Sequence, residues 1–275
     1  MLLRGNIMKL SEIIRQIENI APLAIAAPWD NSGMQVAALR RDIAHLAVML
    51  DPTPGNIQKA LDMGADMVLS HHPLAIKARM PDTLGDFHTV LRLLFCHDIP
   101  LYSAHTSLDA NLHGPAAWLA EALALTNRKA LEKTAECSES EQLYGFGIVG
   151  ELPRAMPYHA FAQKLAALLG KGAWRACGPE PETVTRMAYC PGSGESMLHA
   201  AVAAGVDIYI TGDVKYHAAL ETPVRVLDVG HFILEEIMMR TFANTLRETC
   251  APLTVSFFEA VDPFVFEGTP GHPYI

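Results

Sequence analysis

The chain lacks paired cysteines, long hydrophobic runs and any cluster of basic residues. Its five cysteines are scattered, odd in number and never in a C-x-x-C pair, which argues against a disulfide framework and a thiolate zinc site. No stretch approaches 18 uninterrupted apolar residues, and the first ten residues contain no apolar signal-peptide core. We therefore expect a cytoplasmic protein with reduced thiols and no membrane partner.

Acidic residues outnumber basic ones. The sequence has 30 Asp and Glu against 21 Lys and Arg, a formal net charge of -9, so the electrostatic attraction that drives nucleic-acid binding is missing. We expect no direct nucleic-acid partner. Half of the 275 residues are hydrophobic and 19% are charged, against about 25% charged in an average protein. The chain can thus build a large core, as two domains or one large α/β unit, and still leave apolar surface for subunit contacts.

Two segments share the order strand, turn, helix, glycine, strand. Residues 46–50 and 67–69 are apolar runs that flank a helical stripe ending at Gly64, and residues 187–189 and 208–210 flank another that ends at Gly205. Each glycine is followed two residues later by an aspartate. We predict two related parallel strand–helix–strand units, residues 46–73 and 187–214. The Gly192-Ser193-Gly194 segment between strand and helix fits a tight turn or a small anion-binding helix start.

Residues 132–142 form the most polar stretch of the sequence and are a candidate linker. The spacing of apolar residues predicts the remaining helices and strands. Helices are expected from Leu10 to Pro22 and over 84–97, 115–125, 158–169 and 231–248, with strands over 99–104 and 224–227.

Three predicted strands end in residues that ligate metals. His71 and His72 follow residues 67–69, Asp109 follows residues 99–104, and His231 and Glu235 lie four apart where the last strand meets the long helix. Because open α/β sheets bind ligands at the carboxyl ends of their strands, these five side chains should converge. Imidazoles and carboxylates without thiolates suit two divalent first-row ions, with Zn, Mn, Fe and Ni all admissible.

Other side chains near these strand ends have two interpretations. His105 is a candidate catalytic residue or a hydrogen-bonding loop residue, and His217 a proton-shuttling, substrate-binding or domain-interface residue. Asp30, with Asn31 and Gln35 near Trp29, lines the site or forms a capped turn. Glu236, about 100° around the helix from Glu235, should face water.

The motifs, in order over residues 8 to about 250, resemble those of the NIF-three-like family of dinuclear-metal proteins, widely labelled type-two GTP cyclohydrolase I homologues. The matching segments are 29–36 (Trp-Asp-Asn-Ser-Gly-Met-Gln-Val), 64–74 with Ser-His-His-Pro, 102–111 with His-Thr-Ser-Leu-Asp, 147–153, 210–217 (Ile-Thr-Gly-Asp-Val-Lys-Tyr-His) and 230–235. The resemblance implies that His71, His72, Asp109, His231 and Glu235 bind the metals, the same five residues that the strand ends indicate.

The resemblance further implies a short form of the family with two similar α/β domains, mainly parallel sheets and pseudo-twofold symmetry. The expected domains are residues 1–126 plus 222–275, which hold the metals, and an inserted domain, 127–221. Residues 267–275, with His272, match nothing in the family pattern.

Two functions remain open at this point. One is a metal-dependent hydrolase in which two cations make a water acidic enough to attack a small polar substrate such as a nucleotide; GTP ring opening follows only from the family label. The alternative is a non-catalytic protein that binds the same metals for storage, delivery or regulation. Metal ligands look alike in both cases.

The resemblance implies a homohexameric ring whose metal sites face its interior, and the high apolar content agrees with subunit contacts. We expect light scattering of the purified protein to report a homo-oligomer, most simply a hexamer. A 30.0 kDa monomer at micromolar concentration would contradict this.

Overall fold

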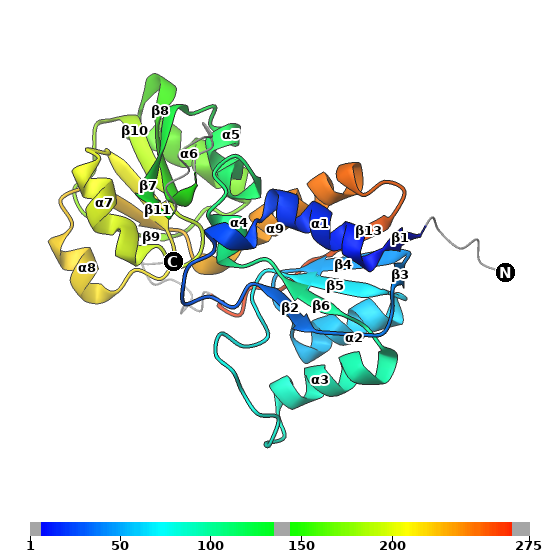
Figure 1. Ribbon diagram of the computed structural model, residues 1–275. Coiled ribbons are helices and arrows are strands. Elements are labelled where there is room, and N and C mark those ends of the chain that lie inside the picture. The colour runs from blue at the N-terminus through cyan, green and yellow to red at the C-terminus, as the bar shows by residue number, and fades with distance from the viewer. Residues whose placement is uncertain (1–6, 135–143, 266–275) are drawn as a thin grey trace.

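A computed structural model describes residues 7–134 and 144–265 of the chain. The C-terminal residues 267–275 and most of the predicted linker, 132–142, lie outside the described residues. Two sheets are connected by the long helix α9 (His231–Thr249), which runs from one to the other (Figure 1). No helix within the described ranges is long and apolar enough to cross a membrane.

The first sheet has the strand order β13-β4-β5-β6-β2 and is parallel except for β2. Its strands are β2 (Gly33–Val36), β4 (His45–Met49), β5 (Met67–Ser70), β6 (Leu101–Ser103) and β13 (Thr254–Phe258). Helices α2 (Pro54–Asp62) and α3 (Asp86–His97) lie on one face, and α1 (Leu10–Ile20) and α9 on the other (Figure 1).

Both faces of this sheet are buried, which explains the continuous apolar runs in its strands. Successive side chains of a strand point to opposite faces. Accordingly, Leu46 and Val48 belong to the core beneath α1 and α9, whereas Ala47 and Met49 belong to the core beneath α2 and α3. Strands β1 (Met8–Lys9) and β3 (Asp42–Ile43) form a separate, antiparallel two-stranded sheet.

The second sheet has the strand order β7-β8-β10-β11-β12-β9, with a parallel centre formed by β10, β11 and β12. Its strands are β7 (Thr126–Lys133), β8 (Gly145–Pro157), β9 (Arg175–Cys177), β10 (Thr183–Tyr189), β11 (Ile208–Thr211) and β12 (Arg225–Asp228). Helix α6 (Tyr158–Leu169) packs into one core and α7 (Leu198–Ala203) into another. Shorter helices are η1 (Leu23–Ile25), α4 (Thr106–Asp109), η2 (Pro115–Ala117), α5 (Trp118–Ala122), η3 (Glu195–Met197) and α8 (Tyr216–Glu221).

The predicted internal repeat is confirmed. Strand β4 pairs with β5, and β10 with β11, both in parallel. The aspartate after each glycine makes equivalent hydrogen bonds. Asp66 Oδ2 accepts hydrogen bonds from the backbone N–H groups of Ala44 and His45 (2.9 and 3.1 Å). Asp207 Oδ2 accepts hydrogen bonds from the backbone N–H groups of residues 185 and 186 (2.8 and 2.9 Å). Each carboxylate thereby ties the start of one strand to that of its parallel neighbour.

One feature differs from the sequence-based expectation. The domain division predicted between residues 221 and 222 precedes β12, which pairs with β11 in the second sheet, so the chain leaves that sheet only after Asp228. Residues Gly147 and Gly150 lie inside strand β8. Gly147 has φ 64°, and a Cβ there would lie 2.8 Å from Leu131 Cδ1 on β7, so a larger residue would strain the backbone and displace the Leu131 side chain.

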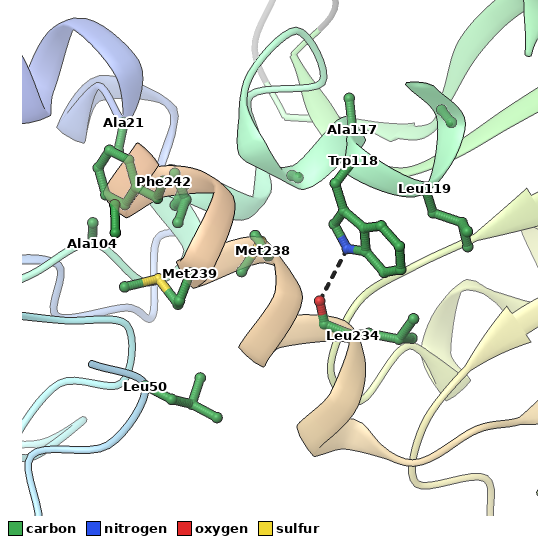
Figure 2. Close-up of a cluster of buried hydrophobic side chains, with 14 of the residues drawn as sticks. Ala21, Leu50, Ala104, Ala117, Trp118, Leu119, Leu234, Met238, Met239 and Phe242 are labelled. Carbon is green, nitrogen blue, oxygen red and sulfur yellow. Dashed lines mark hydrogen bonds between the residues drawn. The ribbon is translucent and has the colours of Figure 1, made fainter. Parts of the chain in front are cut away.

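Helix α9 is fixed at its first turns by a buried cluster (Figure 2). Trp118 Nε1 donates a hydrogen bond to the carbonyl of Leu234 (3.0 Å). Met238, Met239 and Phe242 continue the buried face of α9 toward Leu50 and Ala104 of the first sheet (Figure 2). The indole thus positions the residue immediately before Glu235.

Replacing Trp118 by Phe should lower the free energy of unfolding by about 2 kcal/mol, since the substitution leaves the Leu234 carbonyl without this donor and opens a small cavity. Urea unfolding measures the change. The same substitution at Trp29, whose side chain is 62% exposed, should change it by less than about 0.5 kcal/mol. Equal stability of both variants would contradict the anchoring role of Trp118.

Candidate metal centre

The two adjacent histidines lie where β5 has ended. Both their backbone N–H groups donate to the carbonyl of Leu50 (3.2 and 3.1 Å), and the hydroxyl of Ser70 donates to the carbonyl of His72 (2.7 Å). These bonds bend the chain out of the strand geometry that would point neighbouring side chains apart. As a result the rings of His71 and His72 lie on the same side, with centroids 5.0 Å apart.

Each histidine of the cluster has its Nδ1 bound to an acceptor. His71 Nδ1 donates to the carbonyl of Ala104 (2.8 Å). The other three donate to carboxylates, with these pairs and distances: His72 to Asp51, 2.7 Å; His105 to Asp30, 2.6 Å; His231 to Asp213, 2.8 Å. A histidine held in this way directs Nε2 toward the cluster, and once that nitrogen is deprotonated it offers a lone pair, as metal-binding histidines do.

The other four predicted side chains lie around the carboxylate of Glu235, which is buried. Glu235 Oε1 lies 3.5 Å from His71 Nε2, and Oε2 lies 3.2 Å from His72 Nε2 and 2.8 Å from His231 Nε2. Asp109, on α4, approaches His71 Nε2 to 3.7 Å. The structure therefore brings together side chains from both sheets around one buried carboxylate.

Four buried atoms of the cluster form no hydrogen bond of good geometry within the described residues: His71 Nε2, Asp109 Oδ1, His231 Nε2 and Glu235 Oε2. The 2.8 Å approach of His231 Nε2 to Glu235 Oε2 is an ion-pair contact only. Buried polar atoms almost always have partners, so four converging orphans indicate a missing ligand. Nitrogen and oxygen donors of this kind fit a divalent first-row cation. Two donor sets lie within 4.8 Å, His71 with His72 and His105, and His72 with His231 and Glu235. Residues that could bind metal ions are therefore present.

Protons balance the charge of the cluster in the metal-free chain. Burial alone would lower the pKa of His72, but the carboxylates of Asp51 and Glu235 raise it to about 10. The carboxylate of Glu235, opposed by burial, raises the pKa of His231 to about 9. Burial alone would raise the pKa of Glu235, yet the surrounding imidazoles hold it well below its usual range. Metal ions can replace such protons as the positive charge beside a buried carboxylate.

The predicted site residues His105 and His217 differ in their surroundings. The His105 ring lies 5.2 Å from that of His71 and 5.7 Å from that of His72, which places it among the potential metal-holding groups. His217 is exposed on α8, its ring contacts Tyr216, and it makes no contact with the cluster among the described residues.

The expectation that Glu236 faces water is wrong. It is 4% exposed, its Oε1 accepts the backbone N–H of Ala260 (3.0 Å), and burial raises its pKa to about 7. The helical rotation places Glu236 away from Glu235, but the chain after β13 covers that side of α9.

Sequence reasoning missed the orienting roles of Asp51 and Asp213 and left that of Asp30 open. Asp30 accepts hydrogen bonds from His105, Ser32 and Thr106, which together overcome burial and lower its pKa. The available signal was position: Asp51 lies two residues after the end of β4, and Asp213 two residues after the end of β11, just as His72 lies two residues after the end of β5. Asp213 adopts a left-handed φ of 58°.

The Gly192-Ser193-Gly194 segment is a tight turn that packs on the cluster. Gly192 has φ 64°, and a Cβ there would lie 2.1 Å from Glu235 Oε1. Gly194 N–H donates to Thr211 Oγ1 (2.9 Å). The second unit therefore leaves the space that the Glu235 carboxylate occupies.

These features define a two-domain α/β protein with a histidine and carboxylate cluster that could bind metal ions at the junction of its sheets. The chain belongs to the Duf34/NIF3 (NGG1p interacting factor 3) family, whose model matches residues 8–263.

Related proteins agree with this assignment. The GTP cyclohydrolase 1 type 2 homolog of Clostridium perfringens is 33% identical over 94% of this chain and 100% of its own length, and that of Escherichia coli K12 is 31% identical over 93% and 98%. Reduced HcgD from Methanocaldococcus jannaschii is 29% identical, with a TM-score of 0.80 over 92% of this chain and 98% of its own. A Bacillus cereus protein related to NIF3 shares the fold, with a TM-score of 0.84, 21% identity and coverage of 96% and 100%.

Replacing Gly192 by Ala should displace the Glu235 carboxylate and lower the metal content of the purified protein. Gly205 provides the matched control: its φ is 66°, but a Cβ there meets nothing within 4 Å. Both alanines bear the left-handed backbone strain, about 1 kcal/mol, and only the first contacts the cluster. Elemental analysis showing equal metal in both variants would contradict the packing argument.

Metal affinity should rise with pH. At pH 7 the raised pKa values keep His72 and His231 protonated in the metal-free protein, and a metal must displace both protons. Each unit of pH from 6 to 8 should therefore strengthen the apparent affinity by about a hundredfold. Competition with a chelator at several pH values measures this, and a pH-independent affinity after correction for the chelator would contradict it.

Proposed function

We propose that this protein is a hydrolase dependent on two divalent metal ions that acts on a small polar substrate such as a nucleotide. The observation that carries the proposal is the group of four buried, unpartnered nitrogen and oxygen atoms beside a pocket that His72 and His231 also line. A structural metal site is usually closed, whereas a catalytic one adjoins space for substrate.

The two donor sets share His72, and Glu235 has one carboxylate oxygen beside His71 and the other beside His72 and His231. This arrangement supports two ions, which Glu235 would help to hold together with Asp109 as a second buried carboxylate. Zn, Mn, Fe and Ni all suit these donors. When bound, such ions polarise a substrate oxygen and lower the pKa of water.

The chain's own residues hold the donors in place. Asp30, Asp51 and Asp213 fix the imidazole rings of His105, His72 and His231, and the Ala104 carbonyl fixes His71. We assign His105 to this metal-holding group, since its ring lies against both His71 and His72. The name of these relatives, GTP cyclohydrolase 1 type 2 homolog, supports a nucleotide ring as one substrate to test.

The activity test compares metal-loaded with metal-stripped protein on nucleotides, phosphoesters and cyclic amides. We expect turnover of one of these classes that is lost on stripping and restored by adding metal. Full metal loading without turnover of any class would overturn the hydrolase and favour the non-catalytic alternative of metal storage, delivery or regulation.

Replacing Glu235 by Gln should weaken metal binding by roughly a hundredfold or more and should abolish turnover. Losing a group that only supports a metal ligand already costs up to about a hundredfold in affinity, and Glu235 is proposed to contact the metals directly. The amide has one neutral oxygen where the carboxylate has two charged ones. The matched control is Glu236→Gln, because Glu236 bonds only to Ala260 among the described residues and its amide can keep that bond. Equal metal content in both variants would remove Glu235 from the site.

A further inference from the structure

A pocket of about 690 Å³ adjoins the cluster, and His72 and His231 belong to both. Its other walls come from distant parts of the chain. They are residues 50 and 51 after β4, residues 171, 174, 175 and 213 of the second domain, residues 228–232 where β12 leads into α9, and residues 262–265 after β13. This volume is in the range of cavities that hold small molecules, roughly 300–1,000 Å³.

Aromatic side chains supply flat apolar surface to the pocket. Trp174, Phe232 and Phe264 all line it. The Trp174 ring is partly buried and packs against the main hydrophobic core, so it is held as a rigid surface. Planar rings stack on such side chains.

Two cationic side chains, Lys171 and Arg175, line the same pocket. Arg175 is 69% exposed; its Nη2 bonds to Asp228, while Nε and Nη1 donate no hydrogen bond within the described residues. The pocket also reaches Gly230, which precedes the 19-residue helix α9, so the positive end of that helix dipole faces the same space.

The four aspartates of the pocket already accept hydrogen bonds from the protein. Asp51 and Asp213 bind His72 and His231. Asp228 binds Arg175 and the backbone N–H groups of residues 214 and 230, and Asp262 binds the backbone N–H of Phe264. An anionic ligand would therefore meet the free Nε and Nη1 donors of Arg175, whereas the aspartate oxygens already have partners within the protein.

We propose that this pocket binds a planar ring that carries an anionic group, with the ring against Trp174 and the anion at Arg175 and Lys171. We identify this planar, anionic ligand with the non-reacting part of the substrate, an identification that rests on the proposed function. The binding of the ligand depends on the pocket alone and not on hydrolysis. A purine nucleoside monophosphate has the required ring and charge and serves as the probe.

The experiment titrates metal-loaded protein with guanosine monophosphate, guanosine and inorganic phosphate by calorimetry. We expect the monophosphate to bind more tightly than either fragment. Trp174→Leu should weaken the monophosphate and guanosine by about tenfold, the loss of one stacking contact. Arg175→Gln should weaken only the monophosphate and phosphate, by about tenfold, because guanosine has no charge.

Matched controls are Phe95→Leu, an exposed aromatic on α3 (64%), and Arg154→Gln, an exposed cation on β8; neither lines the pocket. Both should bind all three probes as the wild type does. Thermal melting and metal content of each variant establish that it is folded and loaded. Unchanged monophosphate affinity in folded Trp174→Leu and Arg175→Gln, or no binding of any probe to the wild type, would overturn the proposal.

Turnover assays on the same variants distinguish a failure of the pocket proposal from a failure of the hydrolase proposal. Probe binding that weakens as expected supports the pocket even when no substrate is hydrolysed. Conversely, turnover with an unchanged KM in both pocket variants keeps the hydrolase and overturns the pocket assignment.

Discussion

The burial of Glu235 is the constraint on which the rest of the site depends. A carboxylate removed from water costs several kcal/mol unless opposite charge surrounds it, and here the imidazoles of His71, His72 and His231 provide that charge. Their positions in turn require the bend after β5 and the start of α9 to meet. The hydrogen bond from Trp118 to Leu234 holds the helix at this point, and the absent side chain of Gly192 leaves room for the carboxylate.

Orientation of the imidazoles is the second requirement, and both domains supply it. Asp30, Asp51 and the Ala104 carbonyl come from the first domain, whereas Asp213 comes from the second. Each acceptor fixes one ring and leaves Nε2 free to face the cluster. The site therefore exists only at the junction of the two sheets, and the pocket beside it also draws its walls from both.

The two units of the internal repeat share one architecture but carry different residues at their strand ends. In each unit an aspartate two residues after a left-handed glycine ties two parallel strands together. The loops at the strand ends differ: the first unit places His71 and His72 there, and the second places Asp213 and the Gly192 turn. The repeat thus supplies two candidate metal donors and their partner Asp51 from one half, and Asp213 and the Gly192 turn from the other.

The sequence by itself determined the alternation of strands and helices, the repeat and the convergence of five side chains. These follow from local periodicity and from the rule that parallel strands share a carboxyl edge. Only the tertiary structure decided what covers each surface. Helical rotation turns Glu236 from Glu235, yet the chain after β13 buries it. Residues 174 and 175 line one pocket with residues 262–265, although they are far apart in sequence. Burial and close approach depend on non-local packing, which no local pattern encodes.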